Sequence, residues 1–243
     1  MKPPVQPVKE LGVQDKFHYN GPMSLVNLIQ GLRSLLLPPA CAGCQTPLPE
    51  IGPTPLCRAC WDALPRSRPP WRRVYGRSFD QVVSPCRYGG VIQELIVSLK
   101  YEGRLSLIPF LGQLLAEPVR EHLGTDPAEG IVPVPLHPTR LRERTFNQAQ
   151  FLAQNLAGRL KLPCWSHLLS RKEPTRSQSE LPQEERWKNV QGAFALNPDP
   201  LIRYARLLLV DDVFTTGATA ESCARLLKQG GAAQVTVVAA AHG

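Results

Sequence analysis

The stretch "LLLVDDVFTTGATAESCARLL", residues 207–227, carries the strongest indication of the fold. It opens on four consecutive apolar residues, as expected for a short strand that is buried on both faces of a parallel sheet. From Thr219 onward apolar residues recur at helical spacing, and two glycines, Gly230 and Gly231, end that pattern. The following "VTVVAAA", residues 235–241, indicates the next strand. The stretch therefore predicts one β-α-β unit of an open α/β sheet.

Two acids and a Thr-Thr-Gly-Ala-Thr turn stand between the predicted strand and helix. Ligands of open α/β sheets bind beyond the carboxyl ends of the strands, and a Thr/Gly turn that opens a helix offers backbone N–H groups and hydroxyls to an anion. Next to a phosphate, Asp211 and Asp212 suit ribose hydroxyls or a hydrated magnesium ion. The combination indicates a site for a 5-phosphoribosyl group. The alternative is an ordinary strand end with solvated acids and a helix cap.

Other nucleotide-binding loops fit this turn less well. A Walker loop requires Gly-Lys-Ser/Thr, and a dinucleotide fingerprint requires G-x-G-x-x-G; the turn at 211–219 contains neither.

Four of the seven cysteines form two C-x-x-C pairs, Cys41 with Cys44 and Cys57 with Cys60. Two such pairs place four thiolates in two turns, which suits tetrahedral Zn²⁺. Because sulfur fills all four positions, we expect a structural rather than a catalytic zinc ion. A redox pair or two disulfides are the alternatives. The single cysteines, Cys86, Cys164 and Cys223, sit among apolar neighbours and are predicted to be buried thiols.

The segment 66–77 combines five arginines with two aromatic residues and contains no acid. Arginines interleaved with aromatic rings are typical of surfaces that bind single-stranded nucleic acid. The alternative is an interdomain linker with solvated arginines, which Pro69 and Pro70 stiffen. The arginines are Arg66, Arg68, Arg72, Arg73 and Arg77, and the aromatic residues are Trp71 and Tyr75.

The middle of the chain predicts a second strand, loop and helix. The apolar run 131–134 ends in prolines and a basic loop with Arg140, Arg142 and Arg144, and a helical pattern follows from Ala149. Arginine forks suit phosphate oxygens. Before this unit, 92–99 and the segment beginning at 105 predict two helices that lean on the sheet, and the polar segment 170–192 is typical of a mobile loop or of disorder.

Taken together, the motifs resemble a known family. "LLLVDDVFTTGAT" resembles the phosphoribosyl pyrophosphate (PRPP) loop of type I phosphoribosyltransferases, and the rest of the chain resembles the ComF family, the competence-associated branch of that group. The other matching pieces are "LLLPPACAGC", "LCRACWDALP", "LIVSLKYEG", "VPVPLHPTRLRERTFNQAQ" and "GAF". They span about 35–241 in unbroken order.

The resemblance implies an α/β fold of the type I phosphoribosyltransferase kind, a mostly parallel sheet with helices, preceded by a small four-Cys zinc module. It also implies PRPP and Mg²⁺ as ligands. Asp211 and Asp212 would be the catalytic acids. The PRPP contacts would be Val213, Phe214, Thr215, Thr216, Gly217, Ala218 and Thr219, with Arg140 and Arg144 near the pyrophosphate; a lid would carry Arg171, Lys172, Gln178 and Arg186.

One position departs from the family pattern. Members usually carry Arg-Gly-Phe-Asn-Gln where this chain has Arg144-Thr145-Phe146-Asn147-Gln148. If the glycine serves a positive φ or a close approach to the ligand, Thr145 shifts or narrows that loop. His137, beside the same loop, is a candidate base or a surface histidine.

Length and composition complete the expected organisation. The chain has 243 residues, 43% of them hydrophobic, and a net charge of +8. We expect a tail at 1–22, an amphipathic helix at 24–37 and the zinc module within 23–75, a hood region at 76–130, and the phosphoribosyltransferase-like domain at 131–243. Since no apolar stretch approaches the roughly 20 residues of a membrane span and the start lacks an export signal, the expected location is the cytoplasm.

Three functions remain open at this point. The first is a PRPP-dependent enzyme in the uptake or processing of DNA, which transfers phosphoribosyl to a nitrogen acceptor. The second is a non-catalytic DNA-uptake adaptor that binds single-stranded DNA through the zinc and arginine region, works with proteins of the uptake machinery, and keeps PRPP as a regulatory or vestigial ligand. The third is a zinc-ribbon nucleic-acid binder with an α/β scaffold. The intact loop at 211–219 argues against the third.

Overall fold

The computed structural model describes residues 39–243, except for 50–51, 53, 75, 125–126 and 173–191. Residues 39–243 form one compact unit. The tail predicted at 1–22 and the amphipathic helix predicted at 24–37 lie outside the described residues. Within the described part, no helix has the length and apolar character needed to cross a membrane.

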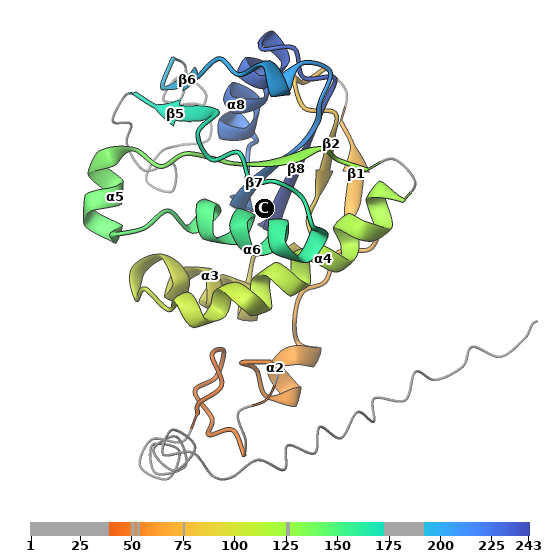
Figure 1. Cartoon of the computed structure of the whole chain (residues 1–243). Coiled ribbons are helices and arrows are strands. Elements are labelled where there is room, and N and C mark those ends of the chain that lie inside the picture. Colours follow the sequence, from red (N-terminus) through yellow and green to blue (C-terminus); the bar gives the residue numbers. More distant parts are fainter. Residues whose placement is uncertain (1–38, 50–51, 53, 75, 125–126, 173–191) are drawn as a thin grey trace, which may run out of the picture. The chain divides into compact units, whose positions relative to one another are not determined.

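A mostly parallel sheet forms the centre of the fold (Figure 1). Its main path runs β1-β2-β8-β7-β4, and β3 also pairs with β8. Among the strands named on this path, β1 and β2 pair antiparallel; β8 lies parallel to β2, β3 and β7, and β4 lies parallel to β7. The strands are β1 (Trp71–Arg73), β2 (Gln81–Val83), β3 (Cys86–Arg87), β4 (Gly130–Pro133), β7 (Arg206–Phe214) and β8 (Gln234–His242).

Helices cover both faces of this sheet (Figure 1). One face packs against α3 (Gly90–Tyr101), α4 (Ile108–Leu123) and α6 (Gln148–Leu160). The other packs against α8 (Ala218–Gln229) and the antiparallel pair of β5 (Leu169–Arg171) with β6 (Phe194–Leu196). The short elements are α2 (Arg58–Asp62), η1 (Leu105–Leu107), α5 (Pro138–Arg144) and η3 (Pro200–Ile202). The predicted mostly parallel α/β sheet with helices is therefore confirmed.

The apolar run in β7 reflects burial on both faces. Leu208 and Val210 belong to the core under α4 and α6, whereas Leu207 and Leu209 belong to the core under α8. Successive side chains of a strand point to opposite faces, so a strand between two helical layers needs apolar residues at every position. Each fully buried leucine contributes about 1.5–3 kcal/mol to folding.

The four-cysteine module packs directly on the first helical layer. Leu56 and Leu64 belong to the same core cluster as α3 and α4. The Trp61 ring meets the Phe110 ring of α4 edge to face, with centroids 6.0 Å apart. Strands β1 to β3, which precede residue 130, join the same sheet as β4, β7 and β8. The domain boundaries expected at 22, 75 and 130 stay predictions.

Candidate functional site

The loop between β7 and α8 lies at the carboxyl edge of the sheet. Strand β7 continues through both acids to Phe214, beyond the apolar run, because β8 pairs with it as far as His242. Gly217 then caps α8 with φ 78°. A Cβ at this glycine would stand 3.0 Å from the Phe214 ring. Both the positive φ and this close approach require glycine here, so the predicted turn is a tight connection.

The two acids face opposite sides of β7. Asp212, only 8% exposed, points to the α3 side, where its Oδ1 lies 2.8 Å from Lys100 Nζ. Asp211 lies on the α8 side, near the Cys223 thiol, whose pKa is raised by burial and, to a lesser extent, by the charge of Asp211. The Asp212 backbone N–H also donates a hydrogen bond to Asp211 Oδ1, at 2.8 Å. Lys100 was not among the candidate site residues predicted from the sequence.

The electrostatics of the acid pair favour a proton on Asp211 near neutral pH. Burial raises the pKa of Asp211 to about 7, and the neighbouring Asp212 raises it as well. The positive charges of Lys100 and Arg171 act in the opposite direction. A carboxyl group that titrates near pH 7 and lies beside a tight turn can respond to a bound cation or hydroxyl, which stabilises its ionised form.

The raised pKa of Asp211 should make the free energy of unfolding depend on pH. The unfolded chain loses the Asp211 proton near pH 3.8, whereas the native protein keeps it to about pH 7. Ionisation therefore costs more in the native state, and the free energy of unfolding falls as pH rises between these two values. Asp211→Asn removes this contribution, so wild type should lose more stability than the variant between about pH 5 and about pH 8. Urea unfolding at both pH values measures the difference, and equal losses would contradict the assignment.

The neighbouring strand brings a second loop to the same edge. Because β4 pairs with β7 in parallel, from Gly130 opposite Leu207 to Pro133 opposite Val210, the segments that follow these strands lie side by side. The segment after β4 enters α5, which carries both predicted pyrophosphate arginines, Arg140 and Arg144. The side chains of these two arginines lie outside the described part of the structure. The two predicted loops therefore follow adjacent parallel strands at the same edge of the sheet.

The predicted basic loop is in fact mostly the helix α5. His137 caps it: its Nδ1 accepts a hydrogen bond from the Thr139 N–H at 3.2 Å. His137 is buried, which corrects the expectation of a surface histidine. Asn147 caps α6 in the same way through Ala149 N–H, and its Nδ2 donates to the carbonyl of Val134 at 3.1 Å. These caps fix the chain that leads away from β4.

Thr145, between α5 and α6, adopts the left-handed conformation with φ 65° and ψ −12°. The backbone at this position therefore has a positive φ, which glycine adopts without strain. A β-branched residue in this region is strained, because its Cβ approaches the backbone too closely.

Replacing Thr145 with glycine should relieve the strain. We expect Thr145→Gly to raise the free energy of unfolding by about 1 kcal/mol relative to Thr145→Ala, which keeps a Cβ but lacks the hydroxyl and the branch. Chemical denaturation of the two variants gives the comparison. If the glycine variant is no more stable than the alanine variant, the strain is absent.

The predicted lid is described only at its start. Arg171 ends β5, and its guanidinium lies over the Phe194 ring of β6, 5.2 Å from the centroid. Lys172 is exposed, and its N–H donates to the Ala193 carbonyl at 2.8 Å. Gln178 and Arg186 lie outside the described residues. Arg171 is thus held by the β5–β6 pair, close enough to Asp211 to lower the pKa of that acid.

The four predicted metal ligands lie together. The Sγ atoms of Cys41, Cys44, Cys57 and Cys60 are all within 4.8 Å of one another, with Cys44 and Cys57 3.7 Å apart. Zinc–sulfur bonds of about 2.3 Å at tetrahedral angles place the sulfur atoms about 3.8 Å apart, so the cluster fits such an ion.

The environment of the cluster also suits thiolates. Burial opposes ionisation of Cys41, but backbone N–H groups of Cys44, Cys57 and Gly43 outweigh it and bring the pKa down to about 6. Burial and, after it, the hydrogen bonds with the other three thiols together raise the pKa of Cys60 to about 12. A cation between the four sulfur atoms would remove this mutual repulsion. Of the single cysteines, Cys86 and Cys223 are buried as predicted, and Cys164 is partly buried.

The arginines of segment 66–77 do not form one surface. Arg66, Arg68 and Arg72 line a pocket of about 500 Å³ at the carboxyl edge of the sheet. Arg73, next to Arg72 in β1, instead lines a pocket of about 280 Å³ at the amino ends of β2, β7 and β8. Arg77 lines a third surface hollow. Successive side chains of a strand point to opposite faces of the sheet, so Arg72 and Arg73 of β1 line different pockets.

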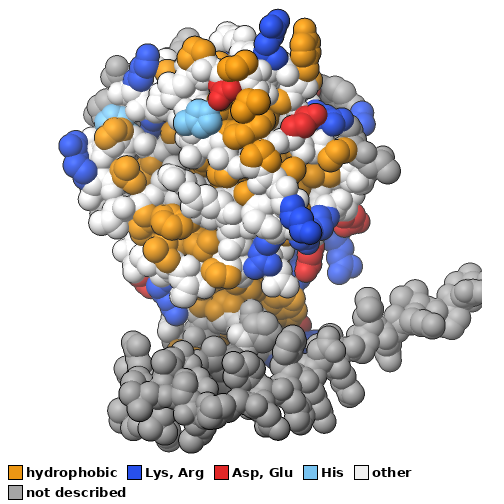
Figure 2. Space-filling view, in the orientation of Figure 1, with side chains coloured by type: hydrophobic (Ala, Val, Ile, Leu, Met, Phe, Trp, Pro, Cys, Tyr) orange, Lys and Arg blue, Asp and Glu red, His pale blue; other side chains and the backbone are white. Residues whose placement is uncertain are grey.

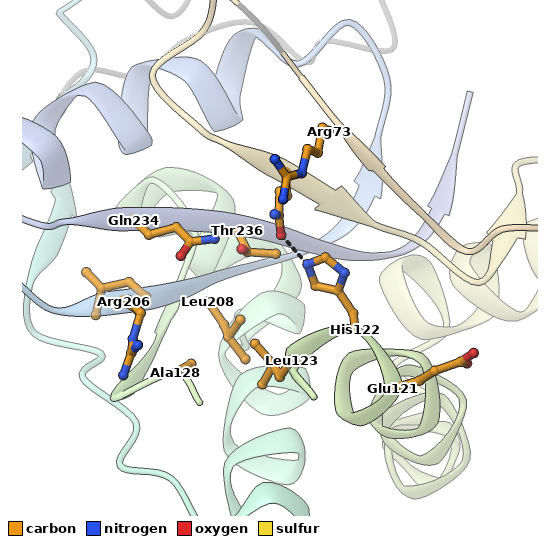
Figure 3. Close-up of a pocket in the computed structure, with 11 residues that line it drawn as sticks. Arg73, Glu121, His122, Leu123, Ala128, Arg206, Leu208, Gln234 and Thr236 are labelled. Atoms are coloured by element: carbon orange, nitrogen blue, oxygen red, sulfur yellow. Dashed lines mark hydrogen bonds between the residues drawn. The ribbon is translucent and has the colours of Figure 1, made fainter. Parts of the chain in front are cut away.

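Figure 3 shows the pocket of Arg73. His122, in the last turn of α4, lies beside β2, and the dashed line marks its hydrogen bond to Gln81 Oε1. Partial burial lowers the pKa of His122, and the charge of Arg73 lowers it further. Arg206 stands across the pocket from Arg73 (Figure 3) and forms an ion pair with Glu129. This pocket lies at the opposite end of β7 from Asp211 and Asp212.

Comparison with solved structures finds weak similarity. A purine phosphoribosyltransferase from Pyrococcus horikoshii is 15% identical with a TM-score of 0.36, covering 57% of this chain and 83% of that one. An adenine phosphoribosyltransferase from Leishmania donovani is 21% identical with a TM-score of 0.33, covering 59% and 55%. Scores this low leave the architecture to be judged from the strand order and pairing themselves. No family model matches the chain.

Comparison with curated proteins is more informative. Competence protein F of Haemophilus influenzae is 30% identical over 214 residues, which cover 81% of this chain and 87% of that protein. DNA utilization protein YhgH of Salmonella typhimurium is 33% identical over 196 residues, covering 79% and 80%. Competence protein ComFC of Streptococcus pneumoniae is 28% identical over 148 residues, covering 61% and 62%. The similarity to the first two extends over most of each chain, and the chain belongs to the ComF family.

Proposed function

We propose that the protein binds Mg²⁺–PRPP at the loop 211–219 and transfers its phosphoribosyl group to a nitrogen acceptor, in the uptake or use of DNA. The observation that supports this most is the acid pair with its Lys100 partner, followed at once by the turn capped by Gly217. The names of the relatives, competence protein and DNA utilization protein, support the biological setting.

Each part of the loop has a role in this proposal. Thr215, Thr216, Gly217, Ala218 and Thr219 would surround the 5-phosphate with hydroxyls and with the first N–H groups of α8. Val213 and Phe214 would shape the end of the strand beneath them. Asp211 and Asp212 would accept hydrogen bonds from the ribose hydroxyls. Through its ion pair, Lys100 would hold the Asp212 carboxylate in position until the diol arrives.

The proposed reaction balances without a redox partner. The lone pair of the acceptor nitrogen forms the new bond to ribose C1. The bond from C1 to the pyrophosphate oxygen breaks, and its electron pair leaves with pyrophosphate. A proton of the acceptor passes to solvent. Magnesium, when bound, neutralises charge on the departing pyrophosphate. Asp211 and Asp212 favour the positive charge that develops at C1, and the arginines of α5 would receive the leaving group.

The four cysteines would hold a structural zinc ion. All four positions around it would be sulfur, which leaves none for water or substrate. Through Trp61 against Phe110, the ion would secure the module to α4. This role is independent of the reaction at the loop.

Pyrophosphate release tests the enzymatic proposal. The zinc-loaded protein is incubated with PRPP, Mg²⁺ and, in turn, free bases, nucleotides and single-stranded oligonucleotides. We expect one acceptor class to release pyrophosphate with wild type and not with Asp211→Asn/Asp212→Asn. PRPP binding without release for every acceptor would favour the second candidate, the DNA-uptake adaptor, which the concentration of arginines at the carboxyl edge also supports.

A further inference from the structure

A strongly basic pocket of about 500 Å³ lies where the chain leaves the cysteine module and reaches the sheet. Four arginines and one histidine line it, together with Pro69 and Pro70, and its lining includes no acidic residue. Within the part of the chain that the structure describes, none of the four arginines forms an ion pair. The five basic residues are Arg66, Arg68, Arg72, Arg87 and His242.

The positive potential of this basic pocket acts on the groups inside and beside it. Partial burial lowers the pKa of His242, and the charges of Arg72 and Arg87 lower it further. Burial raises the pKa of the Cys86 thiol to about 11, while the charge of Arg66 opposes the rise. A concave surface with several cations and no counter-charge concentrates the field and attracts an anion.

The arginines are held by their neighbours. The Arg66 guanidinium lies over the Trp61 ring, 4.5 Å from its centroid, and Arg72 lies over the Phe214 ring at 5.8 Å. Stacking of this kind keeps the planar fork oriented, so less conformational entropy is lost when it binds phosphate oxygens. Pro69, Pro70 and Val82 add an apolar wall against which a ring can pack.

The basic pocket borders the candidate PRPP loop on one side only. His242 lies opposite Phe214 in the β7–β8 pair, and a Cβ on Gly243 would be 3.8 Å from Thr215 Cγ2. The sheet order places β8 on one side of β7 and β4 on the other. The basic pocket therefore flanks the loop on the side away from α5, where the pyrophosphate arginines were predicted. Its arginines are therefore a different set of cations from the predicted pyrophosphate arginines of α5.

We propose that this basic pocket binds the phosphate of a nucleotide and, resting on the proposed function, that the phosphoribosyl acceptor is a nucleotide rather than a free base. Arginine forks match phosphate oxygens, and the volume is in the range of small-ligand pockets, about 300–1,000 Å³. A phosphate held here would fix the acceptor next to the loop that carries the ribose.

Titration of the full-length, zinc-loaded protein with the four nucleoside 5′-monophosphates and with the corresponding nucleosides tests the proposal. We expect at least one monophosphate to bind about tenfold or more tightly than its nucleoside. In Arg66→Gln/Arg87→Gln this preference should disappear. These two arginines are chosen because, unlike Arg72, neither lies over Phe214.

A matched variant controls for the loss of two positive charges. Arg73→Gln/Arg225→Gln removes two exposed arginines that line other hollows. It should keep the preference for the monophosphate. Equal binding of monophosphates and nucleosides by wild type would overturn the proposal, and so would a preference lost equally in both double variants.

Two further titrations identify the source of the phosphate and test the PRPP site separately. An oligodeoxythymidine with a 5′-phosphate, compared with the same strand without it, shows whether a strand end or a free nucleotide supplies the group; dependence of either on Arg66 and Arg87 supports the proposal. Titration with PRPP on Arg66→Gln/Arg87→Gln should match wild type. If wild type fails to bind PRPP but still prefers monophosphates, the proposed function fails and the phosphate site stands.

Discussion

Asp211→Asn/Asp212→Asn lowers the affinity for Mg²⁺–PRPP by about a hundredfold or more, because hydrogen bonds to charged groups contribute about 1.5–3 kcal/mol each and two carboxylates are lost. Asparagine keeps the size of both side chains, so the packing at the end of β7 changes little. Isothermal titration calorimetry with PRPP in excess Mg²⁺ measures the effect directly.

A second pair of acids serves as control. Glu94→Gln/Glu102→Gln removes two exposed carboxylates, one within α3 and one at its C-terminal cap. It therefore changes the net charge by the same amount as the Asp211/Asp212 variant. Its PRPP affinity should equal that of wild type. If the control weakens binding as much as the Asp variant does, the effect is one of overall charge, and the loop has no special role.

Removing the metal from the cysteine cluster should destabilise much of the protein. Structural zinc sites contribute roughly 10 kcal/mol or more to the folding of small zinc modules. Here the module also supplies Leu56 and Leu64 to the core and Trp61 to the contact with Phe110, so its loss exposes part of the α3–α4 layer. We expect Cys41→Ser/Cys60→Ser, or treatment with a strong chelator, to lower the melting temperature by about ten degrees or more.

Zinc content and thermal unfolding are measured on the same samples. Cys164→Ser, which changes a partly buried thiol outside the cluster, should keep one zinc ion per chain and nearly the wild-type melting temperature. A cluster variant that lacks zinc but melts like wild type would show that the metal has no structural role.

The sequence predicted those features whose residues are close together along the chain. The acids, the turn and the helix of the candidate loop fall within a few residues, and the spacing of the four cysteines needs no knowledge of the fold. Alternation of apolar residues between two cores also explains why β7 could be recognised as a buried strand.

Contacts between segments that are far apart in the sequence could not be predicted from local patterns. Lys100 reaches Asp212 only because α3 packs against the end of β7, and its own surroundings in the sequence indicate an ordinary helix end. The separation of Arg72 from Arg73 follows from strand alternation, but Trp71–Arg73 is too short to be identified as a strand. α5 did leave a local signal: Pro138 at its first position after a residue that caps.

Arg72 and Arg73 also show why composition alone did not define an arginine surface. Neighbours in the sequence, they belong to pockets at opposite ends of the sheet. Arg87 of β3 and His242 of β8 complete the lining of the basic pocket. The sequence of segment 66–77 does not indicate that these two residues lie beside it. The parallel pairing of β3 with β8 places Arg87 opposite His242.

The central claim, that the loop 211–219 holds PRPP, is tested most directly by calorimetric titration of the zinc-loaded wild-type protein with PRPP, with and without Mg²⁺. The account predicts saturable binding at one site per chain that weakens strongly when Mg²⁺ is withheld. Absence of binding by a folded, zinc-loaded protein would contradict it and would shift attention to the cysteine module and the basic pocket.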